Sequence, residues 1–161
     1  MARRRVQIEW YGDDFLAVVR RYGDDALFAA GEVVQHAAEQ RAPRGATGRL
    51  RGSGYVSTGS RSTYRAKRYW RREKKPPTGA ATVGFSAPHA HLLEGGRRKS
   101  GVIRPKRKRA LRIDGKYRAR ASYRRMDAQP FLGPAIDATK DSMVKELAGV
   151  LNKHLERELP K

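Results

Sequence analysis

Hydrophobic residues recur every three or four positions in two long segments, one near each end of the chain. In residues 13–41 and again in residues 134–159, this spacing gathers the apolar side chains along one face of a helix. The recurring positions of the first segment are Phe15, Val19, Tyr22, Ala26, Ala30, Val33 and Ala37. Those of the second segment are Ile136, Met143, Leu147, Val150, Leu151 and Leu155. The pattern therefore predicts two long amphipathic helices.

Local residues indicate where these helices begin, end or bend. Pro43 follows the first segment and lacks a backbone donor, so the first helix is expected to end near Arg41. Gly23-Asp24-Asp25 interrupts the same segment, and because an aspartate can cap a fresh start, either two helices or one kinked helix fits the pattern. Pro134 suits the first turn of the second helix.

Between the helices, short apolar runs alternate with turn-forming residues. The candidate strands are residues 50–57, 80–85, 101–104, 109–113 and 117–123. Asp114-Gly115 lies between the last two of them, and this pair supplies the positive backbone angles that a tight hairpin turn needs. Residues 86–96 are typical of a helical turn that ends at Gly95-Gly96. These features favour an antiparallel sheet.

The predicted elements combine into an α+β fold, in which an antiparallel β-sheet packs against an N-terminal and a C-terminal helix and carries long basic loops or a basic hairpin. A chain of 161 residues suffices for one hydrophobic core, so we expect a single domain over residues 1–161. Its parts are a basic N-terminal arm (1–12), the first helix (13–41), the sheet and loops (48–131) and the second helix (134–159). No apolar run approaches the length that spans a bilayer, so we expect no membrane partner.

The chain is strongly basic, with a formal charge of +20 from 36 Lys and Arg against 16 Asp and Glu. Both helical segments are nearly neutral, so the excess lies elsewhere. Residues 61–75 carry eight bases and one acid, and residues 97–125 carry fourteen bases and one acid, Asp114. A charge balance of this kind favours contact with a polyanion.

Two interpretations of the basic segments stay open, because their side chains could meet either nucleic-acid phosphates or an acidic protein surface. Charged strand residues can also form an ordinary solvated face or block unwanted strand pairing. The sequence shows no paired aromatic platform, so recognition of particular bases is not indicated. The candidate contact residues are Arg65, Lys67, Arg68, Arg71, Arg72, Arg104, Lys106, Arg107, Lys108, Arg109, Arg118 and Arg120.

Few residues point to catalysis. His89, His91 and Glu94 are close in sequence and could ligate a divalent metal. On a helix the two histidines face different ways, and on a strand Glu94 points away from both, so neither geometry gathers the three side chains. The chain also has no cysteine. We therefore expect no cofactor and no enzymatic activity, and a metal-dependent enzyme is the less favoured alternative.

Four short motifs follow one another in a particular order. Ala42-Pro43 and Thr47-Gly48-Arg49-Leu50-Arg51 lead out of the first helix, and Leu93-Glu94-Gly95 closes the helical turn. Pro105-Lys106 precedes Ala110-Leu111-Arg112, and Pro130-Phe131-Leu132-Gly133-Pro134-Ala135 opens the second helix. In this order the motifs resemble those of the neck proteins of long-tailed bacteriophages, the family of tail-completion and head-to-tail joining proteins. The chain departs from that family at Gly96, where a threonine is common, and in the long basic insertion of residues 61–75.

The resemblance implies a structural virion protein of the head-to-tail interface, acting in the neck, in tail completion or as the tail terminator. Such a subunit forms a homo-oligomeric ring, commonly a hexamer, that joins the connector to the tail tube and lets double-stranded DNA pass. Its implied partners are its own copies, the portal-side connector, the tail-tube proteins and DNA held by non-specific electrostatics. Its implied location is the virion neck, with the host cytoplasm as the place of assembly.

In a ring of this kind we expect the junction after the first helix to lie near a neighbouring subunit, where its glycines allow close backbone approach. The candidate subunit-interface residues are Thr47, Gly48, Leu50, Glu94, Gly95 and Phe131. A stand-alone, sequence-independent nucleic-acid-binding protein is the alternative, because the composition alone is sufficient for one.

Overall fold

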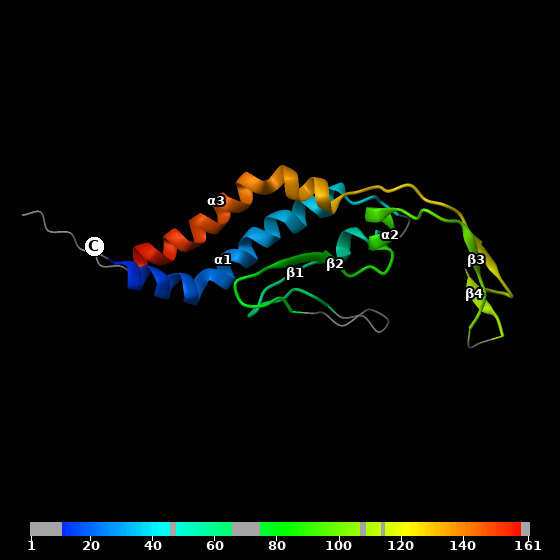
Figure 1. Cartoon of the computed structure of the whole chain (residues 1–161), viewed down its shortest axis with the longest axis horizontal. Coiled ribbons are helices and arrows are strands. Elements are labelled where there is room, and N and C mark those ends of the chain that lie inside the picture. The colour runs from blue at the N-terminus through cyan, green and yellow to red at the C-terminus, as the bar shows by residue number, and fades with distance from the viewer. Residues whose placement is uncertain (1–10, 46–47, 66–74, 107–108, 114, 159–161) are drawn as a thin grey trace, which may run out of the picture.

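The computed structural model of the protein describes residues 11–45, 48–65, 75–106, 109–113 and 115–158. Helix α1 (Gly12–Arg41) packs along helix α3 (Leu132–Glu158), which runs in the opposite direction (Figure 1). Strands β1 (Gly54–Ser57) and β2 (Thr82–Phe85) form an antiparallel pair that packs against α1. The α+β fold and both long helices are therefore confirmed.

Helix α1 is a single element across Gly23, which excludes the alternative of two separate helices. Its buried residues are Val18, Ala26, Phe28, Ala30, Gly31, Val34 and Ala38. This set is wider than the single stripe that the sequence predicted, because α1 contacts α3 as well as the strand pair. Phe15, expected on the packed face, is instead 46% exposed.

The strand pair lies close against α1 because residue 31 is a glycine. A Cβ atom placed on Gly31 would lie 2.6 Å from Cγ1 of Val56, a fully buried residue of β1. Strand β1 pairs with β2 in the register Val56 to Val83. It begins later than the predicted strand 50–57, since a short 3₁₀ turn, η1 (Arg51–Ser53), forms in the first part of that segment.

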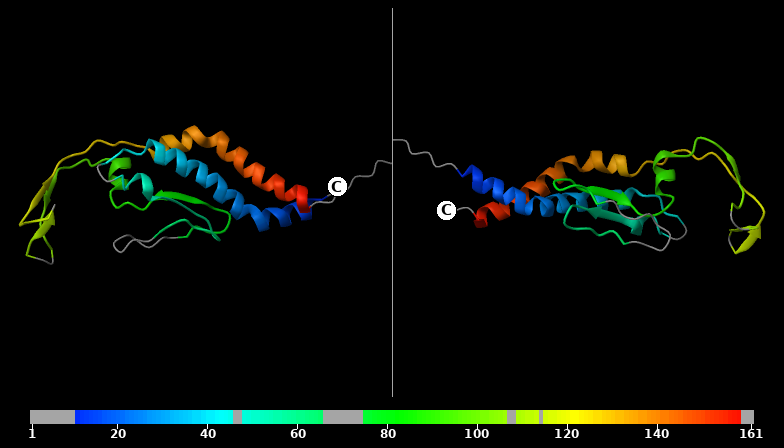
Figure 2. Two further views of the ribbon diagram at one scale, coloured as in Figure 1. Left: turned by 180° about the vertical axis from the view of Figure 1, so that it is seen from behind. Right: turned by 60° about the horizontal axis from the view of Figure 1, so that its bottom comes forward.

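The remaining strands form a separate hairpin. Strand β3 (Gly101–Ile103) pairs with β6 (Ala121–Tyr123), and β4 (Leu111–Ile113) pairs with β5 (Lys116–Arg118). We call residues 97–126 the hairpin arm, because Arg97 and Met126 form an antiparallel bridge at its base. The arm extends away from the helices and from β1 and β2 (Figures 1 and 2).

The prediction that all strands belong to one antiparallel sheet was wrong. The strands form three two-stranded ladders instead of one sheet, and the predicted strand 117–123 is divided between β5 and β6. The predicted hairpin turn is confirmed by the β4–β5 pairing, with Gly115 at φ 79°. In the part of the chain that the structure describes, no strand of the arm pairs with β1 or β2.

Helix α2 (Ala90–Gly95) confirms the predicted helical turn, and it ends at Gly96, whose φ is +68°. Helix α2 contributes to a hydrophobic core at the end of α1, which we call the junction core. The buried members of the junction core are Ala38, Ala42, Leu50, Ala87, Ala90, Phe131 and Ala135. Leu93 of α2 packs against these residues from the side.

Candidate functional site

The sequence motifs that leave α1, pass through α2 and open α3 meet in the junction core. Leu50 is 3% exposed and Phe131 is 2% exposed, so these two interface candidates are buried within the chain itself. The ring of Phe131 lies edge-on to that of Phe85 of β2, with 4.8 Å between the ring centres. Aromatic pairs favour this geometry, and it joins α3 to the first strand pair.

The arginine of the first motif completes the end of α1. Arg51 donates from Nε to the carbonyl of Ala42 at 2.8 Å and from Nη2 to the carbonyl of Gln40 at 3.0 Å. The last carbonyls of a helix have no partner within it, so a cation placed there supplies hydrogen bonds and complements the helix dipole. Gly48 has φ 59°, which favours glycine at this turn, and Thr47 lies outside the described residues.

Glu94 of α2 caps the start of α3, where backbone N–H groups have no partner within the helix. Its Oε2 accepts hydrogen bonds from the backbone N–H groups of Phe131 and Leu132, at 2.9 and 3.1 Å, and its Oε1 accepts one from Gly133 at 3.0 Å. The next residue is Pro134, which has no N–H to satisfy. One carboxylate from α2 therefore caps the whole first turn of α3, and the exposed Gly95 follows it.

Burial of the Glu94 carboxyl would by itself raise its pKa, but the hydrogen bonds from Phe131, Gly133 and Leu132 outweigh burial and lower the pKa below its ordinary value. Because the folded-state pKa is depressed, the stabilisation is complete above roughly pH 4.3, the ordinary value for glutamate. It declines as the pH falls through the lower pKa of the folded protein.

We expect Glu94→Gln to lower the free energy of unfolding at neutral pH by about 1–3 kcal/mol, because the backbone donors lose a charged acceptor. The difference between wild type and variant should shrink as the pH falls below about 4.3. Denaturant unfolding across this pH range measures both effects. Glu146→Gln, an exposed position on α3, is the matched control, and an equal loss in the control would contradict the capping role.

Two aspartates in the middle of α1 contact the start of the basic segment 61–75. Asp24 Oδ2 accepts the backbone N–H of Ser60 at 3.0 Å, and Asp25 pairs with the guanidinium of Arg61 at 3.0 Å. The same guanidinium lies over the ring of Phe28, 4.3 Å from its centre. The sequence analysis did not predict that these aspartates contact residues 60 and 61. Two adjacent acids within a helix were the one local feature that could have indicated such contacts.

The structure describes only one of the candidate contact residues of segment 61–75. Arg65 is exposed, whereas Lys67, Arg68, Arg71 and Arg72 lie outside the described residues. The predicted role of this segment in binding a polyanion therefore stays a prediction.

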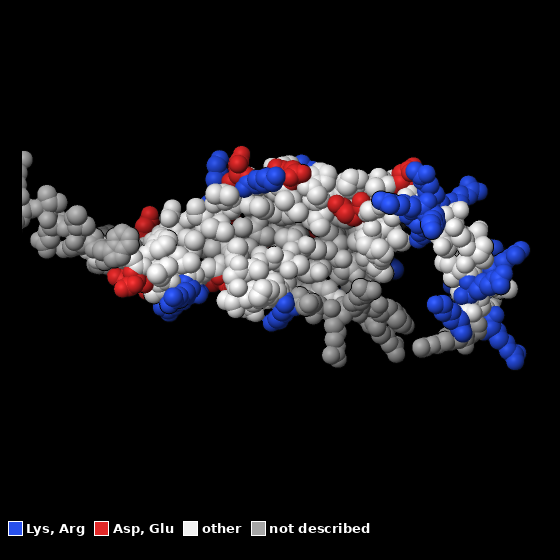
Figure 3. Space-filling model, in the orientation of Figure 1, with Lys and Arg blue, Asp and Glu red and all other residues white. Residues whose placement is uncertain are grey.

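The hairpin arm carries the densest positive charge in the described part of the molecule (Figure 3). Its described candidates are all exposed and are Arg104, Lys106, Arg109, Arg118 and Arg120. Arg107 and Lys108 lie outside the described residues. Arg97 at the base lies over the ring of Tyr123, with 4.4 Å from the guanidinium carbon to the ring centre. The arm thus brings these five candidates onto one projection.

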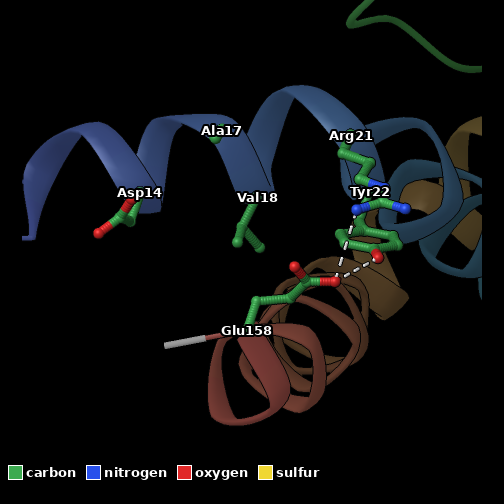
Figure 4. Close-up of a pocket in the computed structure, with 6 residues that line it drawn as sticks. All are labelled: Asp14, Ala17, Val18, Arg21, Tyr22 and Glu158. Atoms are coloured by element: carbon green, nitrogen blue, oxygen red, sulfur yellow. Dashed lines mark hydrogen bonds and ion pairs between the residues drawn. The ribbon is translucent and has the colours of Figure 1, made fainter. Parts of the chain in front are cut away.

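The far end of the helix pair holds a small polar cluster. The hydroxyl of Tyr22 donates to Oε1 of Glu158 at 2.8 Å, and Arg21 pairs with the same carboxylate oxygen at 3.6 Å (Figure 4). The Tyr22 ring stacks on His154, with 3.7 Å between the ring centres. The hydrogen bond to Glu158 raises the pKa of Tyr22. These contacts join the start of α1 to the end of α3.

The three residues considered for a metal site do not form one. Glu94 accepts backbone N–H groups of α3, and His89 and His91 are exposed at the start of α2. Among the described residues, no three His, Asp or Glu side chains gather as metal ligands would. No helix in the described ranges is long and apolar enough to cross a membrane.

Comparison with known proteins gives one family. The model of the family described as "Bacteriophage HK97-gp10, putative tail-component" matches residues 6–96, more than half of the chain. This match includes α1, the first motif, the first strand pair and α2. Neither the curated proteins nor the solved structures contain a match.

Proposed function

The chain belongs to the HK97-gp10-like family of bacteriophage tail components, and from this premise we propose that it is a ring-forming subunit of the virion neck. In this role it joins the head-side connector to the tail tube, as a tail-completion or tail-terminator protein, and leaves a passage for double-stranded DNA. It catalyses no reaction. The family supports a structural tail component of the virion, and the neck position and the ring are our proposal.

The observation that carries the proposal is the incomplete burial of the chain. In α3, Ala135 is the one residue of the described helix that is fully buried, although the helix has 27 residues. Within the described ranges no helix or other strand pair covers the hairpin arm, and an isolated two-stranded hairpin is marginal in water. Surfaces of this kind are typical of subunits that complete their packing against neighbours.

The cationic residues fit a DNA passage or an acidic neighbouring ring. DNA in a neck must slide, so contacts to phosphates without contacts to bases would serve the passage. Arg65, Lys67, Arg68, Arg71 and Arg72 in the loop, and the cations of the hairpin arm, are the proposed contacts. Loop residues 66–74 lie outside the described residues, so their part rests on the sequence alone.

Deletion of the gene from the phage tests the proposed function directly. We expect heads and tails that fail to join or tails that end irregularly, and complementation with the wild-type gene should restore infectious particles. Electron microscopy of the particles and detection of the chain in purified virions are the measurements. Virions that lack the chain and infect normally would contradict the proposal.

The charge of the hairpin arm favours one second candidate, a stand-alone nucleic-acid-binding protein. Such a protein loses affinity steeply with salt, with a log–log slope of about −0.9 per phosphate neutralised. We expect the isolated neck subunit to bind duplex DNA weakly and without sequence preference. Fluorescence anisotropy with two unrelated duplexes over a salt series measures this. Tight binding with a slope of many phosphates, together with absence from virions, would favour the second candidate.

A further inference from the structure

The exposed large apolar side chains of the described residues fall into two groups. Val102, Ile103 and Tyr117 lie on the hairpin arm, with Tyr117 75% exposed. The others lie on the two long helices or directly before α1 and are Tyr11, Phe15, Leu16, Ile136 and Val144. Strands β1 and β2 contain none of these exposed large apolar side chains. The arm and the helices are therefore the surfaces where the chain is left uncovered.

Helix α3 combines this apolar surface with negative charge. Ile136 and Val144 are eight residues apart, which is slightly more than two turns, so they lie on neighbouring parts of one face. Asp137 and Asp141 lie on the same side of the helix and are exposed, and Val144 is 66% exposed. We call Ile136, Asp137, Asp141 and Val144 the outer face of α3. Lys140 lies on the same side and pairs with Asp137 at 2.8 Å, so this face is only slightly acidic.

The hairpin arm carries the complementary combination. Its apolar side chains stand among exposed cations, including Arg118 and Arg120. Residues 97–126 contain fourteen of the 36 Lys and Arg and one of the 16 acids of the chain. The segment 132–158 contains five acids and four bases. One surface is thus apolar and cationic, and the other is apolar and slightly acidic.

We propose that the hairpin arm of one copy docks on the outer face of α3 of a neighbouring copy, and this inference rests on the proposed ring. The contact is intermolecular, because the arm extends away from α3 of its own chain (Figures 1 and 2). Arm and helix are different surfaces, so the interface is heterologous and each copy binds one neighbour and is bound by another. Heterologous contacts of this kind close into rings when the rotation permits.

A protein partner suits the arm better than DNA does. Phosphates would satisfy the cations but leave Val102, Ile103 and Tyr117 in water, since a phosphate backbone offers little apolar surface. Neighbouring strand residues such as Val102 and Ile103 point to opposite sides of the arm. A face with Ile136 and Val144 therefore covers the apolar side chains of one side and supplies carboxylates beside them. Burial of apolar surface provides the affinity, and the opposite charges set the orientation.

Two charge-reversed chains test the docking. The first carries Arg118→Glu with Arg120→Glu, and the second carries Asp137→Arg with Asp141→Arg. Each alone places like charges across the contact, so self-association should weaken about tenfold to a hundredfold. A one-to-one mixture should assemble again, because each arm then meets an α3 of opposite charge. The mixed rings should contain the two chains in equal numbers.

Analytical ultracentrifugation and native mass spectrometry measure these outcomes. Arg20→Glu with Lys75→Glu is the matched control, because it removes the same charge from exposed positions outside both surfaces and should leave assembly unchanged. Val144→Arg should weaken assembly, whereas Leu16→Arg, the same kind of change at an exposed position of α1, should have little effect.

Three results would overturn the inference. The first is wild-type assembly by either charge-reversed chain alone, and the second is a mixture that stays unassembled. The third is a wild-type chain that stays monomeric at every concentration tested. If the arm variant loses DNA affinity while it assembles normally, the arm is a DNA contact. In each case, wild-type chain present in the virion neck would leave the proposed function standing, and its absence from virions would remove that function separately.

Discussion

Phe131→Ala is expected to lower the free energy of unfolding by about 3–5 kcal/mol, as large-to-small changes of buried aromatic residues do. Phe131 is 2% exposed, and its neighbours in the junction core are mostly alanines, which cannot extend to fill a cavity. The change also removes the edge-to-face contact with Phe85. A loss of this size is a large part of the stability of an ordinary domain, about 5–15 kcal/mol.

Chemical denaturation followed by circular dichroism measures the loss. Phe15→Ala is the control, since the same chemical change at a residue that is 46% exposed should cost well under about 1 kcal/mol. Equal effects of the two substitutions would show that the junction core is not the stabilising centre described above.

Gly96→Thr is expected to have the second large effect. Gly96 has φ +68° and ψ −176°, a region that residues with a Cβ atom rarely adopt, and such strain costs about 1–3 kcal/mol. A Cβ atom there would lie 2.8 Å from the backbone nitrogen of Ala128 and 2.9 Å from the carbonyl oxygen of Met126. Backbone atoms must move to relieve this contact, so the base of the hairpin arm should open.

The base is held by two backbone hydrogen bonds between Arg97 and Met126, at 2.7 and 3.0 Å. Hydrogen exchange should therefore show loss of protection at these two amides in Gly96→Thr, together with a lower free energy of unfolding. Gly95→Ala is the control, because a Cβ atom at Gly95 meets nothing within 4 Å. Retained protection in the threonine variant would show that a side chain can be accommodated at this position.

The sequence predicted the helices well because their periodicity is a local property. It placed both long helices within two residues at most of their ends, and it located α2 and the turn at Gly115. The short strands were located with less accuracy, and of their pairings only the one across the turn at Gly115 was predicted. The other pairings depend on which surfaces meet in space, and a pattern along the chain does not record this.

The contacts of Glu94, Asp24 and Asp25 were beyond single-sequence reasoning for another reason. Each of these carboxylates accepts hydrogen bonds from, or pairs with, residues that are more than thirty positions away. A pattern within a short stretch of sequence does not indicate partners that are so far away along the chain. The motifs did locate the right segments, but two residues assigned to a subunit interface, Leu50 and Phe131, are buried in the junction core. Within the subunit these two residues contribute to folding, and their part in a subunit interface stays a prediction.

The junction core also has a consequence for biosynthesis. It joins residues from the end of α1 to Phe131 and Ala135, which are made long after α1 has left the ribosome. Closing such long-range contacts is entropically costly and late in folding, so a nascent or truncated chain cannot complete this core. Only chains that include α3 would then present both the arm and α3 in fixed positions. In the ring that we propose, a chain without α3 would accordingly be kept from entering the assembly and blocking its closure.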